Sequence, residues 1–157
     1  MGQLREACAN AGFAHVRTIL ATGNLVFSAS QTQTVVKHKL DAIVRSHGLD
    51  NAVFLRRPGE LEAVLAQAPF PDAIAARPNH TLVLFLEQEA DTDRATELEA
   101  GWRPERIKAI GRDVYIDYVD GVGRSKLTTA VLEQRLGQPG TARNWNTIEK
   151  LCAAART

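Results

Sequence analysis

The sequence predicts a mixed α+β protein built from two lobes of similar plan. Three observations support this prediction. Apolar residues make up 45% of the 157 residues, which is enough for a packed core. Helical and strand-like patterns alternate along the chain and do not form separate blocks. The order of elements in residues 1–57 then returns, with small changes, in the rest of the chain.

The first lobe, residues 1–57, reads as helix, strand, strand, helix and strand. A short helix ends at Gly12, and a turn whose glycine and asparagine tolerate positive φ separates the first two strands. The second helix has its apolar residues on one face and closes at Gly48. The predicted ranges are Leu4 to Ala11, His15 to Leu20, the turn Ala21 to Asn24, Leu25 to Ser28, Thr34 to His47 and Ala52 to Arg56.

This order is the ferredoxin-like (α-β plait) pattern without its opening strand. That strand normally lies inside the sheet, so its absence exposes ladder groups on its neighbours. Because Met1-Gly2-Gln3 leads directly into a helix, we expect that the start of the chain is shortened or misplaced. The alternative is that another chain or a rearranged strand fills the gap.

The second lobe, residues 58–157, is predicted to open with a helix at Pro58 and a connector over residues 70–79. Strand, helix, strand, strand and helix follow, and an extra helix takes the place of a last strand. The run Thr81 to Leu86 is almost entirely apolar, which is typical of a strand at the centre of a sheet. The run Val114 to Val119 alternates, so we expect one solvated face there. The other ranges are Thr92 to Ala100, Arg106 to Ile110, Ser125 to Leu136 and a final helix with Trp145, Ile148 and Cys152 on one stripe.

Composition and charge exclude several classes of protein. No apolar run approaches the roughly 20 residues that span a bilayer, and no signal peptide is visible, so we expect a cytoplasmic protein without a membrane partner. Cys8 and Cys152 form neither a disulfide framework nor a zinc site, which fits a reducing compartment. The net charge is +1, but residues 1–57 carry +4, residues 58–120 carry −7 and residues 121–157 carry +4. A protein that coats duplex DNA is normally more basic.

One stretch gathers glycines, cations and a hydroxyl just before a predicted helix. It contains Gly121, Gly123, Arg124, Ser125 and Lys126. Backbone N–H groups at a helix start, with Arg and Lys beside them, suit an anion. The spacing matches neither a Walker A loop nor a dinucleotide-binding fingerprint. The alternative is an ordinary turn in which glycine supplies positive φ, Ser125 caps the helix and both cations are solvated.

A second cluster opens the last predicted helix and contains Arg143, Asn144, Trp145 and Asn146. Trp145 and Arg143 would form a stacking face for a base, and the two asparagines would read its hydrogen bonds. The alternative is a capped helix whose Trp145 begins the apolar stripe.

The sequence predicts neither a metal site nor a cofactor. The 4 histidines show no ligand spacing. Ser125 has no His or Asp close to it in the sequence that would suggest a triad. Asp113, Asp117 and Asp120 resemble a metal cluster only loosely, and we expect them on an ordinary solvated face.

Three segments together resemble a known family in their order and spacing. They are Ala21 to Phe27, Gly121 to Leu127 and Thr141 to Thr147, and they resemble the bacterial family called domain of unknown function 1697. The resemblance implies two α-β plait lobes but no established activity, so it assigns no catalytic residue. Members typically begin with a strand and a Gly-rich loop, which this sequence lacks, and this agrees with a shortened start.

We therefore expect a non-catalytic module that binds a phosphate-bearing ligand, either a nucleotide or a nucleic acid segment, at two helix N-termini. Two alternatives stay open. The first is an enzyme that acts on a small anionic substrate. The second is a structural or self-associating domain, such as a homodimer, whose motifs are all folding signals. An α-β plait hosts all three functions, so the fold does not choose among them.

Overall fold

The structure is a computed structural model that describes residues 2–20 and 23–156. It confirms a mixed α+β protein with two separate sheets. The chain forms two compact units, one of Met1–Pro58 with Lys150–Thr157 and the other of Gly59–Glu149. The division into two domains, 1–57 and 58–157, stays a prediction. No helix in the described part of the chain is long and apolar enough to cross a membrane.

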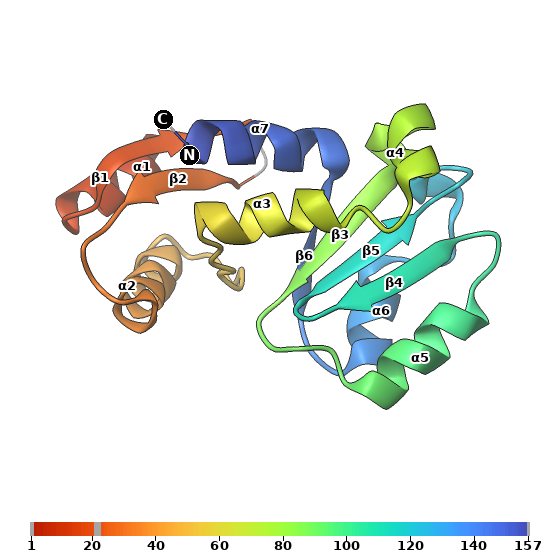
Figure 1. The fold of residues 1–157 in the computed structure, drawn as a ribbon. Helices are drawn as coiled ribbons and strands as arrows, with labels where there is room; N and C mark the ends of the chain where they lie inside the picture. Colours follow the sequence, from red (N-terminus) through yellow and green to blue (C-terminus); the bar gives the residue numbers. More distant parts are fainter. Residues whose placement is uncertain (1, 21–22, 157) are drawn as a thin grey trace. The chain divides into compact units, whose positions relative to one another are not determined.

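The second unit is built on a four-stranded antiparallel sheet in the order β4-β5-β3-β6 (Figure 1). The apolar run predicted to lie at a sheet centre is β3, which is paired on both sides. In chain order the elements are β3 (Thr81–Leu86), α5 (Thr92–Gly101), β4 (Arg106–Ile110), β5 (Asp113–Asp117), the short 3-10 helix η2 (Val122–Arg124), α6 (Thr129–Leu136) and β6 (Gly140–Asn144).

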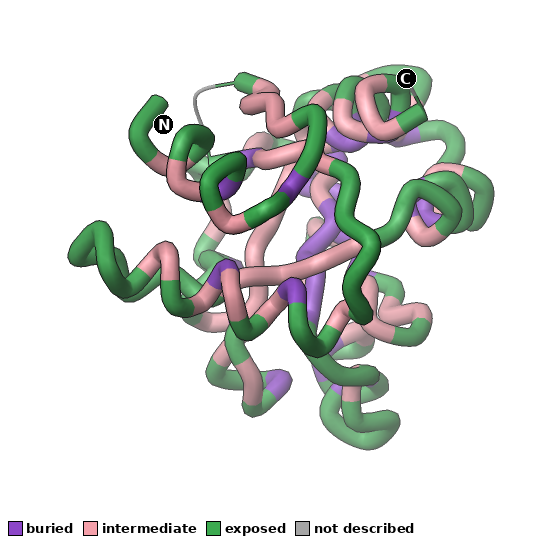
Figure 2. Tube along the Cα trace, turned by 90° about the vertical axis from the view of Figure 1, so that its left-hand side faces the viewer, coloured by how far each residue is buried: buried purple, intermediate pink, exposed green. Residues whose placement is uncertain are grey.

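Helices cover both faces of this sheet. One face packs on α5 and α6 through a buried apolar cluster: Leu84, Leu86, Leu98, Ile107, Val114, Ile116, Tyr118, Leu127, Leu132 and Leu136. On the other face lie side chains of α3 (Pro58–Gln67) and of the first turn of α7 (Trp145–Ala155). There the Tyr115 hydroxyl donates a hydrogen bond of 2.9 Å to the Val64 carbonyl. Buried residues therefore gather along the inner strands (Figure 2).

Three predictions for the second unit are wrong. β5 has no solvated face, because Val114, Tyr115, Ile116 and Asp117 are all buried. The connector over residues 70–79 contains the helix α4 (Pro71–Ala76) and a 3-10 turn, η1 (Pro78–His80). A last strand, β6, does exist before the final helix. β6 is a half-buried edge strand, so its residues do not alternate between apolar and polar. It forms a strand because its backbone hydrogen-bonds to β3.

The first unit contains α1 (Gly2–Asn10), β1 (Ala14–Thr18), β2 (Leu25–Ser28) and α2 (Gln33–Ser46). β1 and β2 pair as the predicted antiparallel hairpin, although Ala21 and Thr22 of its turn lie outside the described residues. The hairpin packs on a buried cluster of Cys8, Phe13, Val36 and Leu40. The Phe13 and Phe27 rings stack with centroids 4.7 Å apart.

The predicted strand from Ala52 to Arg56 is absent. These residues are assigned to no regular element, although Val53 and Leu55 pack partly buried against the same cluster as the hairpin. A strand exists only where a neighbour completes its ladder. In the described part of this unit the sheet has two strands, and neither of them pairs with residues 52–56.

Candidate functional site

The loop from Gly121 to Lys126 does not open a helix, so the prediction of a helix N-terminus there is wrong. Its residues form the 3-10 turn η2, and α6 begins only at Thr129. Thr128 is the true N-cap, because its hydroxyl accepts a hydrogen bond of 3.3 Å from the Val131 N–H. Gly121 has a φ of +90°, which explains the glycine at this position without a ligand.

Ser125 is turned inward, and its hydroxyl is already engaged. It donates a short hydrogen bond to the Glu105 carboxylate and accepts one of 3.0 Å from the Leu127 N–H. The residues on either side of it, Arg124 and Lys126, are both exposed. The loop therefore has two solvent-exposed cations, whereas the Ser125 hydroxyl is used in hydrogen bonds within the protein.

The residues of the second predicted cluster build the junction of β6 and α7. The Arg143 guanidinium donates to the Thr141 hydroxyl at 2.7 Å and to the Ala142 carbonyl at 2.8 Å, and burial lowers the pKa of this arginine. The Asn144 side-chain oxygen accepts a hydrogen bond of 2.9 Å from the Thr147 N–H, which is a helix N-cap contact. Asn146 is exposed on the first turn of α7.

Trp145 is closed to ligands, so the prediction of a stacking face is wrong. Its side chain is only 4% exposed, and its ring centroid lies 6.4 Å from that of Tyr115. The apolar stripe of α7 begins here because Trp145 anchors the helix on the sheet. A base has no access to this indole.

The two predicted clusters lie at the same end of the sheet but do not form one site. Thr81 pairs with Asp117 at the end of β5, and Leu82 pairs with Asn144 at the end of β6. The start of β3 and the turn η1 therefore lie between the two clusters. His80 of η1 packs against the 121–126 loop, since a Cβ on Gly121 would lie 3.6 Å from the His80 Nε2 atom.

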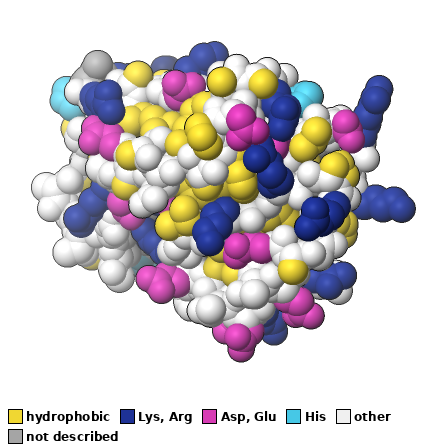
Figure 3. Space-filling model, turned by 45° about the vertical axis from the view of Figure 1, so that its right-hand side comes forward, with side chains coloured by type: hydrophobic (Ala, Val, Ile, Leu, Met, Phe, Trp, Pro, Cys, Tyr) yellow, Lys and Arg dark blue, Asp and Glu magenta, His cyan; other side chains and the backbone are white. Residues whose placement is uncertain are grey.

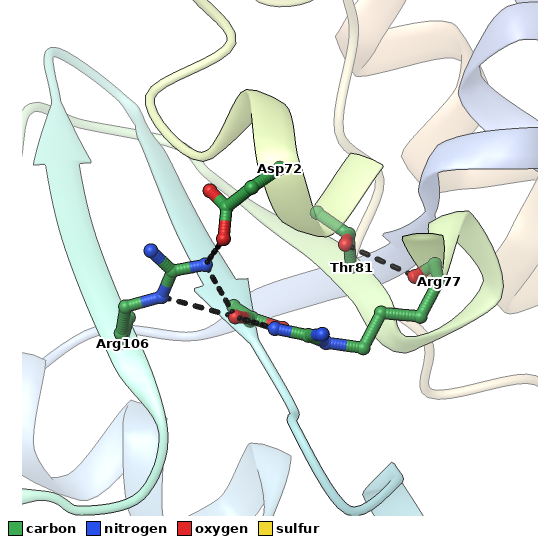
Figure 4. A network of polar contacts seen from close by, with 5 residues as sticks. Asp72, Arg77, Thr81 and Arg106 are labelled. Atoms are coloured by element: carbon green, nitrogen blue, oxygen red, sulfur yellow. Dashed lines mark hydrogen bonds and ion pairs between the residues drawn. The ribbon is translucent and has the colours of Figure 1, made fainter. Parts of the chain in front are cut away.

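A polar network that the sequence did not predict also lies at this end of the sheet (Figure 4). The Asp117 side chain is fully buried between two guanidiniums. Arg77 donates to it through Nε at 2.8 Å and Nη2 at 2.6 Å. Arg106 donates through Nε at 3.1 Å and Nη2 at 2.8 Å, and it also reaches Asp72 at 2.8 Å. Asp117 is therefore not on a solvated face, which corrects the sequence prediction.

The electrostatics of this network are those of a structural ion cluster. Burial raises the pKa of the Asp117 carboxyl, but the hydrogen bonds from Arg77 and then Arg106 hold it below its usual range overall. The hydrogen bond to Asp117 raises the pKa of each arginine, so both stay charged. The two arginines and the two aspartates balance in charge. The cluster thus ties the region of α4 to β4 and β5 and offers no excess charge to an anion.

The signal for this network was weak in the sequence. Arg77 and Asp117 are 40 positions apart, and only the register that places Asp117 opposite Arg106 and Thr81 brings the groups together. The one available indication was an aspartate that directly follows the apolar run Val114-Tyr115-Ile116 at the end of the strand.

Two hollows on the surface of the second unit are lined by residues other than those of the predicted site. One, of about 550 Å³, is lined by Arg94, Glu97, Gln134 and Arg135 of α5 and α6. Across the face shown in Figure 3, cationic, anionic and apolar side chains are intermixed. No group of three or more His, Cys, Asp or Glu within the described ranges could hold a metal ion.

The first unit presents a different kind of surface, a two-stranded sheet. Val16, Leu25 and Phe27 of the hairpin, and Val53 and Leu55 beyond it, are partly buried on one cluster. Within the described residues β2 is paired only with β1, so its other edge carries an open row of backbone groups. The surface thus combines hydrogen-bonding backbone with half-covered apolar side chains.

Comparisons with known proteins agree with this architecture. The model of a family described as "Protein of unknown function (DUF1697)" matches residues 1–115. The structure of a conserved bacterial protein from Streptococcus pneumoniae matches with a TM-score of 0.75 at 19% identity, over 100% of this chain and 89% of that one. At this identity the likeness concerns the fold alone. A search of curated proteins found no match.

Proposed function

The chain belongs to the protein family of unknown function DUF1697, and from the geometry of its first unit we propose that it is a non-catalytic module whose first unit associates with a further β-strand. The observation that carries this proposal is that, among the described residues, β2 is paired on one edge alone. A two-stranded hairpin is marginal by itself, and an open edge beside an apolar surface favours pairing with a further strand. Association would satisfy the open ladder groups of β2 and cover Leu25 and Phe27.

We also infer that both units follow the ferredoxin-like plan. Support comes from the second unit, whose order β3-α5-β4-β5-α6-β6 and sheet order β4-β5-β3-β6 are those of an α-β plait. From α1 onward the first unit has the same order: helix, two paired strands, helix, then residues 52–56 before α3.

A selection experiment tests the association. A library of random peptides displayed on phage is panned against the purified chain, and the enriched peptides are mapped by amide hydrogen exchange. We expect enriched peptides to slow exchange in β2. Enrichment of peptides that protect only the second unit, or no enrichment at all, would exclude the proposed function.

A second candidate function, binding of a phosphate-bearing ligand, is favoured by one observation. The Ser125 hydroxyl is bonded to Glu105, whereas Arg124 and Lys126, two positions apart on the same loop, are both exposed. Two cations on such a loop attract a phosphate group. This candidate uses neither Trp145 nor a helix N-terminus.

Titration with pyrophosphate, followed by the backbone amide NMR signals of residues 121–127, tests the second candidate. The double variant Arg124→Gln, Lys126→Gln should lose the response. The variant Arg103→Gln, Lys150→Gln removes the same charge elsewhere and should keep it. An equal response in both variants would mean that pyrophosphate binding depends only on the net charge of the protein, and it would exclude a specific site at Arg124 and Lys126.

A further inference from the structure

We propose that the hollow lined by α5 and α6 binds a short zwitterionic peptide of dipeptide length. Its carboxylate lies at Arg94 and Arg135, and its ammonium lies at Glu97. The site belongs to the second unit, and it depends neither on strand association at β2 nor on phosphate binding at the 121–126 loop.

The hollow is carried by two helices that are held in place by the core. α5 and α6 pack on the same face of the four-stranded sheet through its buried apolar cluster (Figure 1). Their exposed sides leave a hollow of about 550 Å³, which has the volume of a small-ligand site. It is lined by Arg94, Glu97, Gln134 and Arg135.

Two contacts fix the guanidinium of Arg94. Its Nη1 atom donates a hydrogen bond of 3.3 Å to the Arg135 carbonyl near the end of α6. The same atom lies close to Gly137, where an added Cβ would be 2.9 Å from it. The other N–H groups of this guanidinium bond no group in the described part of the chain. Because the side chain is already held, it loses little freedom when a ligand binds.

The guanidinium of Arg135 is placed by an aromatic ring and keeps its donors unused. It lies 6.0 Å from the centroid of the Trp102 ring, which is a cation–π contact. Among the described residues neither Arg135 nor Arg94 forms an ion pair. A planar guanidinium donates two parallel hydrogen bonds to a carboxylate, so the two arginines suit a ligand that carries one.

Glu97 and Gln134 supply acceptors in the same hollow. Glu97 follows Arg94 by three positions on α5, a spacing that puts their Cβ atoms about 5–6 Å apart. Even so, the Glu97 carboxylate has no ion pair or hydrogen bond within the described ranges, and neither does the Gln134 amide. A carboxylate and an amide oxygen both accept hydrogen bonds from an ammonium group.

A simple anion fits this arrangement poorly, because it would meet the Glu97 carboxylate. The hollow of about 420 Å³ on the other side of Gly137 adds three more carboxylates, those of Glu87, Glu89 and Asp91. A ligand with both charges satisfies the arginines and Glu97 together. An extended dipeptide spans at most about 7 Å, which matches two neighbouring side chains on one helix face.

NMR titration of the whole chain with the dipeptide alanyl-alanine tests the site. We expect saturable shifts of the backbone amides of residues 94–97 and 134–135. The N-acetylated dipeptide has no ammonium and the C-terminal amide has no carboxylate, so each should bind at least about threefold more weakly. Equal binding of the three peptides, shifts confined to other residues, or no saturable shift at all would overturn the proposal.

Two variants assign the ends of the peptide. Arg135→Gln should weaken the free dipeptide at least about threefold but leave the amidated form unchanged, because that form has no carboxylate to lose a partner. Glu97→Gln should weaken the free dipeptide but leave the acetylated form unchanged. Both side chains are exposed, so both variants should keep the circular dichroism of the original chain.

Arg5→Gln is the matched control, since it removes an exposed cation from the first unit and should keep the affinity. If it weakens the dipeptide as much as Arg135→Gln does, binding follows the net charge of the protein and the site is excluded. If Arg135→Gln weakens the free and the amidated dipeptide equally, the carboxylate does not lie at this arginine, and the proposed orientation is wrong.

Discussion

The carboxylate of Asp117 forms a bidentate pair with the guanidinium of Arg77, with Nε–Oδ1 at 2.8 Å and Nη2–Oδ2 at 2.6 Å. The carboxylate has no solvent exposure, and Arg106 approaches it from the neighbouring strand. A buried carboxylate tolerates such a place only when it is paired and hydrogen-bonded. The pair therefore fixes where the region of α4 meets the sheet.

Replacing Asp117 with Asn should strongly destabilise the second unit. The amide keeps the shape but leaves two guanidiniums without their shared counter-charge, and breaking a buried pair in this way costs about 3–5 kcal/mol. Urea unfolding followed by circular dichroism measures the change. Asp50→Asn is the control, because Asp50 is exposed and belongs to the first unit, and it should change stability by less than about 0.5 kcal/mol. Equal effects of the two variants would show that the pair contributes nothing.

The contribution of Asp117 should disappear in acid. Its pKa is lowered in the folded chain relative to an ordinary carboxyl, near 3.9 when unfolded. A lowered pKa gives stability that is present above the unfolded value and is lost as the pH falls towards the folded value. The difference in unfolding free energy between the original chain and Asp117→Asn should be constant from about pH 6 to 8 and shrink below about pH 4. A difference that grows on acidification would contradict the assigned direction.

Local sequence patterns correctly predicted those elements that are determined by their own residues. β3 matches its predicted bounds because its apolar residues are buried on a paired, central strand. Gly137 ends α6 in the left-handed conformation, as a glycine at that position does. The stretch from Ala52 to Arg56 looked equally strand-like, but a strand also needs a neighbour, and the sequence of the stretch holds no information about that neighbour.

The start of α6 and the burial of Trp145 could not be settled from the sequence for a related reason. Glycine, serine and cations before a helix have the same composition whether they bind an anion or form a turn. Two contacts determine the structure of this loop. Glu105, 20 positions away, accepts a hydrogen bond from Ser125, and Thr128 caps the helix, so that the helix starts three residues later than predicted. The sequence left open whether Trp145 forms a stacking face or begins the apolar stripe, and its contact with Tyr115 on a distant strand decides for the stripe.

Gly121 and Gly123 should respond differently to a methyl group. Gly121 has a φ of +90°, so alanine there is strained, whereas Gly123 has neither positive φ nor an atom within 4 Å of an added Cβ. We expect Gly121→Ala to cost about 1–2 kcal/mol and Gly123→Ala to be close to neutral. Thermal unfolding of both variants measures this. If Gly123→Ala were the more harmful of the two, the conformation of the loop would have to differ from the one described.

Thr128 and Thr129 distinguish the two candidate starts of α6. Thr128 caps the helix through its hydroxyl, while Thr129 is its exposed first residue. Thr128→Ala should therefore lower the unfolding free energy by about 1 kcal/mol, and Thr129→Ala should have little effect. Urea unfolding of the two variants is the measurement. A larger loss from Thr129→Ala would mean that the helix begins elsewhere.

The buried position of Trp145 gives a spectroscopic prediction. In a Trp102→Phe background the single remaining indole should emit at short wavelength and be weakly quenched by acrylamide, because its ring is 4% exposed and packs near Tyr115. Nucleotides should leave this emission unchanged, since no base reaches the ring. Trp145→Ala should cost about 3–5 kcal/mol, as large aromatic deletions in cores do, and Trp145→Phe should cost less because it keeps an aromatic contact with Tyr115. Strong quenching together with a nucleotide-dependent shift would restore the stacking surface that burial now excludes.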